Sequence, residues 1–243
     1  MKIFHIPAFT DNYIWAIQKD NHISVIDPGD SGVVIEVLKN NNLTLMDILI
    51  THHHYDHTGG IATLREMMEG KVYGPDNKSI EGIDVTLKER DLLTTLGYNF
   101  RCIETPGHTL DHISYYSELQ GVLFCGDTLF SAGCGRLFEG TYSQMYKSLS
   151  KLSGLPDETS VYCTHEYTLS NLKFAQDQIE DIDIRNEMED LIKKIEDGGI
   201  SLPSTILKEK KINLFLGYKV PNDLQSLCPE DQFRELRIRK DSF

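Results

Sequence analysis

The sequence predicts an α/β fold in which a mixed sheet is covered by helices, followed by a smaller helical domain. Three observations lead to this prediction. Two β-type runs, residues 2–9 and 13–19, flank a Thr-Asp-Asn turn, which is typical of a hairpin. Strand-like and helix-like segments then alternate along the chain. From about Leu169 helical spacing replaces the strand-like runs. We therefore expect residues 1–167 to form the α/β domain and residues 168–243 a smaller helical domain.

The individual elements follow from short apolar runs and their bounding residues. We expect further strands at residues 23–27, 45–50, 71–73, 98–104, 113–116, 122–125 and 161–163. Helices are expected at residues 31–39, 61–69, 171–182, 185–196 and 203–211. Asp183 is a candidate break or N-cap between the third and fourth of these helices, and Pro203 suits the first turn of the last one.

Composition and charge exclude several classes of protein. The 243 residues are 40% hydrophobic and carry a formal charge of −13, which is typical of a globular protein and disfavours nucleic acid as a partner. No apolar run approaches the ~18 residues that a membrane span needs, and the first residues do not resemble a signal peptide. The five cysteines are widely spaced without a C-x-x-C pair, so we expect reduced thiols and a cytoplasmic location.

The segment 51–60, T-H-H-H-Y-D-H-T-G-G, predicts a metal site on a strand-to-helix loop. Its possible ligands are His52, His53, His54, Asp56 and His57. Imidazole nitrogens and carboxylate oxygens are the donors that zinc, iron and manganese prefer. If the backbone is extended here, His52 and His54 point to one side and His53 to the other. We therefore assign His53 to packing or to support of the ligands.

Later strands also end in loops that carry candidate ligands. His108 follows the strand at 98–104, Asp127 the strand at 122–125, and His165 the strand at 161–163. Loops at the ends of several strands of one sheet can assemble a metal site at its edge. For His112 a role in supporting the ligands and a purely structural role are equally compatible with the sequence.

These motifs, in this order, resemble the metallo-β-lactamase superfamily and, within it, the hydroxyacylglutathione hydrolases (glyoxalase II). The resembling segments are residues 11–15, 51–57, 105–109, 126–130, 132–136, 163–167, 213–216 and 237–243, which extend over essentially the whole chain. The resemblance implies an αββα sandwich of two mixed sheets flanked by helices, the catalytic domain of residues 1–167, with a small C-terminal helical domain, residues 168–243, that binds substrate.

The resemblance also implies which residues bind metal. His52, His54 and His108 would bind a first ion, and Asp56, His57 and His165 a second one. Asp127 would bridge both, since the two oxygens of a carboxylate can span two cations ~3.5 Å apart. The ions would be two divalent cations, zinc first, with iron and manganese as alternatives. Asp56 and Asp127 would be the catalytic residues, acting with a metal-bridging hydroxide.

The implied reaction is hydrolysis of the thioester S-D-lactoylglutathione to D-lactate and glutathione, the second step of methylglyoxal detoxification. The expected partner is this small molecule alone, with no nucleic acid and no membrane, and the expected state is a monomer. Arg136, Phe138 and Tyr167 would contact glutathione. Phe138 stands where the family commonly has Tyr, so its ring can pack on the tripeptide but cannot donate a hydrogen bond. The alternative for Arg136 is a surface ion pair with Glu139.

Two positions depart from the family pattern. Asp111 stands where a glycine is more common, which we expect to alter a turn without removing a ligand. Gly217 stands where many members carry an arginine that holds the glycine carboxylate of the substrate. Lys219 could take over this contact, and a solvated surface lysine is the alternative.

Four other functions remain as alternatives. A persulfide dioxygenase of the same superfamily uses a single iron, and Asp56, His57 and His165 together with the helical tail count against it. A β-lactamase or a metal-dependent nuclease is a weaker alternative, because the chain is expected to have reduced thiols and carries a strongly acidic net charge. A thiol nucleophile at Cys134 or Cys163 is not needed beside a metal hydroxide. A metal-binding module without catalysis would be expected to lack some of the ligands.

Overall fold

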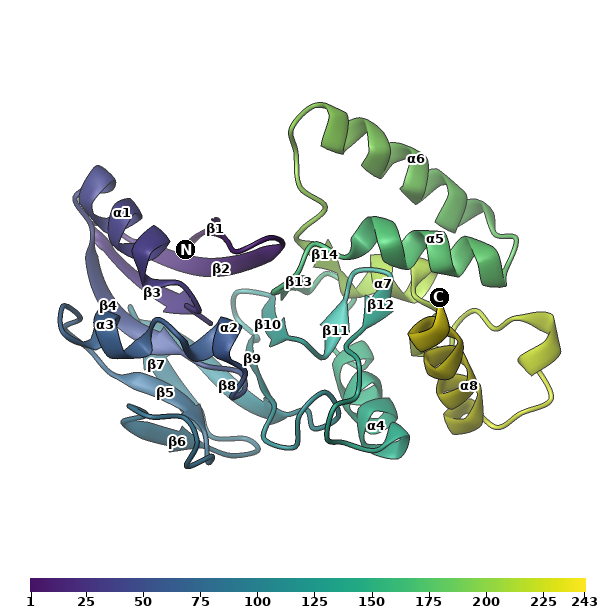
Figure 1. The fold of residues 1–243 in the computed structure, drawn as a ribbon, viewed down its shortest axis with the longest axis horizontal. Helices are drawn as coiled ribbons and strands as arrows, with labels where there is room; N and C mark the ends of the chain where they lie inside the picture. The colour runs from purple at the N-terminus through teal and green to yellow at the C-terminus, as the bar shows by residue number, and fades with distance from the viewer. The chain divides into compact units, whose positions relative to one another are not determined.

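The computed structural model describes all 243 residues and divides the chain into two compact units (Figure 1). The first unit comprises residues 1–104 and 111–126, and the second comprises residues 105–110 and 127–243. Both units contain strands and helices, which confirms the predicted α/β class. The predicted domain boundary near residue 167 remains a prediction. No helix of the chain combines the length and the apolar character that crossing a membrane requires.

A six-stranded mixed sheet forms one half of the first unit. Its strands, in spatial order, are β1 (Lys2–Ala8), β2 (Asn12–Lys19), β3 (His22–Ile26), β4 (Thr44–Leu49), β5 (Val72–Pro75) and β6 (Val85–Leu87). The first three strands are antiparallel and the last four parallel, with β3 common to both sets. The predicted opening hairpin is confirmed, since Lys2 pairs with Gln18 and Ala8 with Asn12.

Helices of the first unit pack against this sheet. They are α1 (Ser31–Asn41), the single turn α2 (Tyr55–Thr58) and α3 (Ile61–Arg65). Val34 and Leu38 of α1 share an apolar core with Leu64 of α3 and with β-branched residues of the strands such as Val25 and Ile48. The four-residue spacing of Val34 and Leu38 places both side chains on one face of α1, which explains why that face is buried.

A second set of strands completes the first unit. These are β7 (Leu92–Thr95), β8 (Tyr98–Glu104), β9 (Ile113–Ser117) and β10 (Val122–Gly126), antiparallel in the order β10-β9-β8-β7. Buried polar contacts join them to the first sheet: the Thr95 hydroxyl donates to Asp47 (2.6 Å), and the Tyr115 hydroxyl donates to the carbonyl of Ile50 (2.6 Å). The short strands β6 and β7 were not among the predicted ones.

The second unit is mainly helical. Its helices are α4 (Tyr142–Ser153), α5 (Thr168–Gln178), α6 (Ile182–Glu196), α7 (Ile206–Ile212) and α8 (Pro229–Ser242), with short 3-10 turns η1 (Leu214–Leu216) and η2 (Asn222–Leu224). Helices α5 and α6 pack against each other (Figure 1). Two small ladders complete it, β11 (Leu129–Phe130) with β12 (Gly133–Cys134), and β13 (Ser160–Cys163) with β14 (Ser204–Thr205).

Some boundaries differ from the prediction. Helix α6 is capped by Asp181 rather than Asp183, because the Asp181 carboxylate accepts from the backbone N–H groups of Asp183 (2.9 Å) and Ile184 (3.2 Å). Helix α7 begins at Ile206 and is capped by Thr205, since Pro203 precedes strand β14 instead of opening the helix. Helices α4 and α8 were not predicted.

The buried carboxylate of Glu209 ties α7 to the turn between β11 and β12. It accepts hydrogen bonds from the hydroxyls of Ser131 (3.0 Å) and Ser204, from the N–H of Ala132 (2.8 Å) and from the side-chain amide of Asn213 (3.0 Å). Burial raises the pKa of Glu209, and these donors partly oppose that shift. The turn that precedes Arg136 is therefore held in place by the hydrogen bonds of the Glu209 carboxylate.

Candidate metal centre

In the first unit the chain leaves β4, bends at His52 and passes through His53 and His54 before α2 begins at Tyr55. His52 Nε2 lies 3.1 Å from His54 Nδ1, so these two imidazoles converge on one point. His53 points elsewhere, and its Nδ1 donates to Asp111 Oδ1 at 2.9 Å. The predicted alternation of side chains is confirmed, and His53 belongs to the supporting contacts.

A chain of hydrogen bonds determines which nitrogen of His52 carries a proton. The hydroxyl of Thr51 donates its proton to Asp27 Oδ2 (2.7 Å), so its oxygen must accept from His52 Nδ1 (3.0 Å). His52 Nε2 is therefore left with a lone pair directed toward His54 Nδ1. A buried imidazole held in this tautomer is a preformed metal ligand.

Asp56 and His57 form a second pair of donors in this unit. His57 Nε2 lies 3.4 Å from Asp56 Oδ2, and its other nitrogen, Nδ1, lies 3.0 Å from Asp27 Oδ2. The side-chain amide of Asn12 donates to Asp56 Oδ2 at 2.9 Å. Asp27 thus orients His57, and Asn12 orients Asp56, as carboxylates and amides that contact metal ligands do in metal sites.

Sequence reasoning missed the supporting roles of Asp27 and Asn12. The sequence did contain a signal for Asp27: a carboxylate at the end of an apolar strand, directly before Pro28-Gly29. The glycine is required there, since a Cβ atom on Gly29 would lie 1.9 Å from the carbonyl oxygen of Asp56. This close approach brings the end of β3 against α2.

Asp111 and His112 also support the histidine segment. Asp111 accepts from His53 and, at 2.8 Å, from the side-chain amide of Asn77. The His112 ring is buried and stacks on His52, with ring centroids 4.9 Å apart and an interplanar angle of 25°. Asp111, noted as a departure from the family pattern, therefore holds His53 in place.

In the second unit one carboxylate oxygen lies close to two imidazoles. Asp127 Oδ2 lies 3.5 Å from His108 Nε2 and 3.4 Å from His165 Nε2. His108 Nδ1 donates to the carbonyl of Arg136 (2.7 Å), so in the neutral imidazole Nε2 is the nitrogen with the lone pair. A Cβ atom on Gly135 would lie 1.9 Å from the carbonyl oxygen of Asp127, so only glycine allows this backbone approach.

The donor sets of both units fit a divalent cation. Two ligand atoms bound to one tetrahedral zinc ion at ~2.0–2.1 Å lie about 3.3 Å apart. The four donor-to-donor distances within the units, 3.1, 3.4, 3.5 and 3.4 Å, agree with this spacing. Neutral imidazoles and carboxylates are also the donor types that zinc, iron and manganese share.

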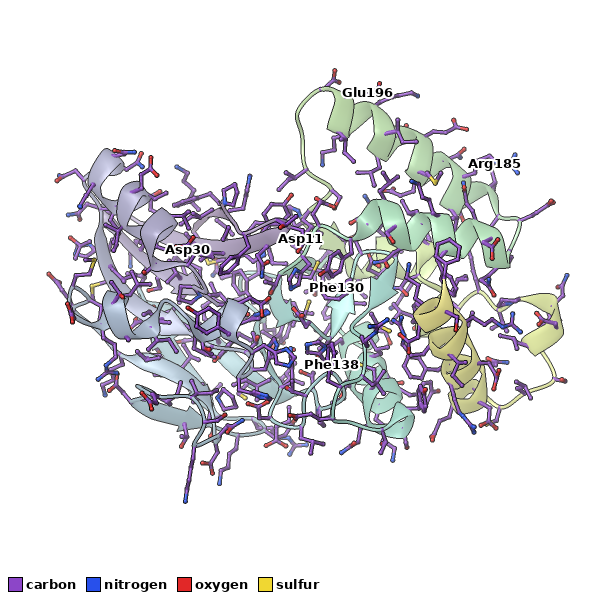
Figure 2. All side chains as sticks on the ribbon, viewed as in Figure 1. Asp11, Asp30, Phe130, Phe138, Arg185 and Glu196 are labelled. Carbon is purple, nitrogen blue, oxygen red and sulfur yellow. The ribbon has the colours of Figure 1, made fainter.

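Three residues predicted to contact substrate lie near these donors in the second unit. Tyr167 stacks on His165, with centroids 4.8 Å apart and an interplanar angle of 4°. The ring of Phe138, labelled in Figure 2, meets His108 edge-on at 5.2 Å and is 63% exposed. Arg136 pairs with Asp241 (3.3 Å) instead of Glu139, which accepts from the N–H of Leu110.

Lys219, the fourth of these residues, lies in an ion-pair cluster. Its ammonium is 2.5 Å from Asp181 Oδ1 and 2.8 Å from Asp183 Oδ2. Burial would lower the pKa of Lys219, but its hydrogen bonds to the two carboxylates outweigh this effect and raise it. Lys219 is therefore neither a freely solvated lysine nor an unpaired cation.

The two cysteines considered as nucleophiles are buried. Burial raises the pKa of the Cys163 thiol, and it also raises that of Cys134 despite the nearby Arg237. Both thiols are neutral at pH 7 and poor nucleophiles, which counts against a thiol mechanism. Of the other three cysteines, Cys102 and Cys125 are also buried and Cys228 is exposed.

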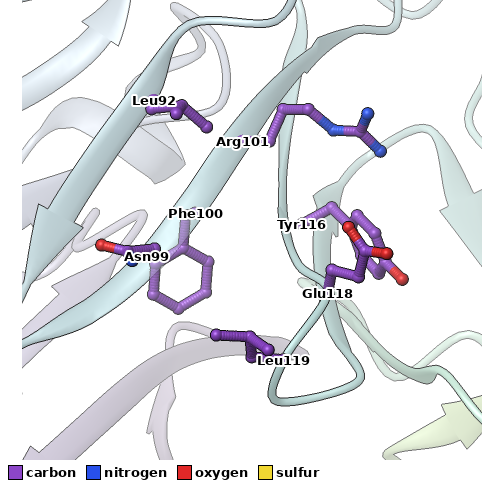
Figure 3. Close-up of a pocket in the computed structure, with 7 residues that line it drawn as sticks. All are labelled: Leu92, Asn99, Phe100, Arg101, Tyr116, Glu118 and Leu119. Carbon is purple, nitrogen blue, oxygen red and sulfur yellow. The ribbon is translucent and has the colours of Figure 1, made fainter.

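A separate cavity of about 200 Å³ opens on β8 and β9 in the first unit (Figure 3). Its lining residues are Leu92, Asn99, Phe100, Arg101, Tyr116, Glu118 and Leu119. The Arg101 guanidinium lies over the Tyr116 ring, 5.6 Å from its centroid. None of the predicted site residues lines this cavity.

Comparisons with known proteins agree with this fold. A family model described as Metallo-beta-lactamase superfamily matches residues 9–76 and 65–165, and one described as Hydroxyacylglutathione hydrolase C-terminus matches residues 166–243. A crystal structure of ETHE1 from Myxococcus xanthus covers 98% of this chain and 90% of its own, with a TM-score of 0.72 and 26% identity. The fold is thus that of the metallo-β-lactamase superfamily, as predicted.

Two curated relatives narrow the assignment further. The hydroxyacylglutathione hydrolase of Pseudomonas fluorescens (strain SBW25) is 51% identical over 221 residues, 89% of this chain and 86% of the relative. That of Chromohalobacter salexigens is 44% identical over the full length of both chains. The chain belongs to the hydroxyacylglutathione hydrolase family.

Proposed function

We propose that this protein hydrolyses S-D-lactoylglutathione to D-lactate and glutathione, the second step of methylglyoxal detoxification. The observation that carries the proposal is the match of residues 166–243 to the C-terminus of hydroxyacylglutathione hydrolases, because this part distinguishes the family within its superfamily. The named relatives extend this similarity over the whole chain. The chain is accordingly a thioester hydrolase, and its partner is a small glutathione thioester.

The proposed cofactors are two divalent ions, zinc first, with iron or manganese as alternatives. His52, His54 and His108 would hold one ion, and Asp56, His57 and His165 the other, with Asp127 shared. The spacing of the donors within each unit supports this division. A protein with the same fold, TTHA1623, has a crystal structure in a di-iron-bound form, with 22% identity and a TM-score of 0.63. When bound, such ions lower the pKa of water toward ~7 and polarise a carbonyl.

The chain's own residues would prepare the site in two ways. Thr51 and the Arg136 carbonyl accept from Nδ1 of His52 and His108, which leaves Nε2 of each ring as the nitrogen that would bind a cation. Asp56 and Asp127, the proposed catalytic carboxylates, supply the negative charge that balances the cations. The departing glutathione thiol has a pKa near ~8.5, so it leaves as a thiolate without a general acid.

Glutathione would be recognised by Arg136, Phe138, Tyr167 and Lys219. The first three are close to the metal donors of the second unit, which supports their assignment. Lys219 is neutralised by two aspartates, so we expect it to contribute less to binding an anionic tripeptide than Arg136 does. We also propose that the protein is a cytoplasmic monomer.

The test is to follow the loss of thioester absorbance with S-D-lactoylglutathione, together with metal analysis of the protein. We expect turnover that chelation abolishes and added zinc restores. A lactoyl thioester of N-acetylcysteamine, which lacks the tripeptide, is the control and should react much more slowly. No metal-dependent turnover, or equal turnover of both thioesters, would contradict the proposal. Oxygen uptake with glutathione persulfide and one iron per chain would favour the dioxygenase alternative.

A further inference from the structure

Helix α8 holds the segment that carries Arg136 at two points in the second unit. Arg237 Nη1 donates to the carbonyl oxygen of Cys134 (3.0 Å), two residues before Arg136. One turn later on α8, Asp241 Oδ1 lies 3.3 Å from Arg136 Nε. The helix therefore contacts both the backbone and the side chain of this segment.

Asp241 is shared by two guanidinium groups. The same Oδ1 atom accepts from Arg237 Nη2 at 2.9 Å. The Arg237 side chain is only 5% exposed, and its guanidinium lies 5.3 Å from the centroid of the Phe215 ring. Asp241 therefore serves as counterion of a nearly buried arginine, which restricts where its carboxylate can lie. Two cations and one anion leave a local excess of positive charge.

Arg136 differs from Arg237 in exposure. Its side chain is 58% exposed, so the guanidinium can reach a ligand while Nε stays beside Asp241. An arginine presents a planar fork of donors, and a carboxylate at Nε leaves the terminal amino groups available. Fixing one side of the fork also reduces the rotamer freedom that binding would otherwise remove.

We propose that Asp241 is a positioning residue that orients Arg136 toward a carboxylate of the glutathione thioester. This inference rests on the proposed function and deepens it. Position 217 offers no guanidinium, and Lys219 is already held by Asp181 and Asp183. Arg136 is thus the proposed substrate-binding cation with the most freedom to meet an anion, and its orientation depends on the end of α8.

The two contacts of α8 predict a split between KM and kcat. The backbone of the segment also supports the metal donors, because the Arg136 carbonyl accepts from His108 Nδ1. That backbone is held by Arg237 at Cys134, a hydrogen bond that does not involve Asp241. Removing the charge of Asp241 should therefore weaken substrate binding and leave the chemical step unchanged.

The experiment measures KM and kcat for S-D-lactoylglutathione in metal-loaded Asp241→Asn, Asp241→Glu and Glu235→Gln proteins. Asp241→Asn should raise KM about two- to fivefold, the factor that corresponds to an exposed ion pair, with kcat unchanged. Asp241→Glu keeps the charge and should restore a lower KM. Glu235→Gln removes one negative charge from the same helix and should leave both constants unchanged. A fall in kcat without a change in KM would overturn the inference.

A double-mutant cycle with Arg136→Ala separates the inference from the proposed function. If Asp241 acts through Arg136, the Asp241→Asn change should add nothing to KM in the Arg136→Ala background. Additive effects, or a normal KM for Asp241→Asn beside a raised KM for Arg136→Ala, would refute the positioning role alone. An unchanged KM for Arg136→Ala would instead refute the proposed contact between Arg136 and substrate.

Discussion

His57 Nδ1 lies 3.0 Å from Asp27 Oδ2, and the same oxygen accepts a hydrogen bond from the hydroxyl of Thr51. The backbone N–H of Thr51 donates to the other oxygen of this carboxylate, Asp27 Oδ1, at 2.8 Å. One buried carboxylate at the end of β3 therefore orients His57 directly and His52 through Thr51. Because it influences a proposed ligand of each ion, Asp27 is the most informative supporting residue to change.

Replacing Asp27 with Asn should weaken metal binding by about 10- to 100-fold, the usual effect of removing an outer-shell carboxylate. The amide keeps the size of the side chain but lacks the charge that favours the proton on His57 Nδ1. Competition with a chelator of known affinity measures the change. Asp20→Asn, on the exposed turn after β2, is the matched control. Equal metal affinity of the Asp27→Asn and unmodified proteins would contradict the role of Asp27.

Replacing Asp127 with Ala should lower both the metal content and the rate. Its Oδ2 atom lies within 3.5 Å of both His108 Nε2 and His165 Nε2, so its loss should reduce affinity by more than the ~10- to 100-fold of an outer-shell change. The prediction is tested by measuring the metal content of the purified variant and its rate of S-D-lactoylglutathione hydrolysis. A variant that retains two ions per chain would refute the bridging role.

Replacing Gly217 with Arg should strengthen substrate binding and reduce stability. Gly217 has φ +76 and caps η1, and no atom lies within 4 Å of a Cβ built there, so the cost is conformational, about 1–2 kcal/mol. Gly217→Ala carries the same backbone cost without a guanidinium. We expect both variants to show the same lower melting temperature and only Gly217→Arg to show a lower KM. A KM equal to that of Gly217→Ala would mean that this position does not face substrate.

Replacing Lys219 with Met should cost at most about 1 kcal/mol of folding free energy at pH 7, since its ion pairs are partly exposed. Burial would raise the pKa of Asp181, but hydrogen bonds from Lys219 and the Ile184 N–H lower it overall. A lowered folded pKa stabilises the protein above the unfolded value of ~3.9, and this contribution is lost as pH falls through the folded value.

Urea unfolding of the unmodified protein and Lys219→Met, at pH 7 and below pH 4, tests this prediction. The difference between the two proteins should shrink as Asp181 becomes protonated. A difference that persists in acid would show that the ion pairs of Lys219 do not account for its contribution to stability. The KM of the same variant tests the proposed contact of Lys219 with glutathione.

The predicted hairpin and the alternation of the histidine segment are both confirmed, because each depends on neighbours in the chain. Side chains two residues apart on extended backbone share a face, so His52 and His54 converge and His53 does not. Helix α8 was missed because its charged residues outnumber the few apolar ones that mark a helical face.

The sequence by itself determined the family, the α/β class and which residues are candidate metal ligands, since these depend on residue types and their order. Only the tertiary structure identified the residues that orient those ligands and the proposed substrate contacts. Asn12 and Asp56 are 44 positions apart, and Arg136 and Asp241 are 105 apart. No local periodicity relates the two residues of such a pair, because they come into contact only when the sheets and helices that carry them have packed.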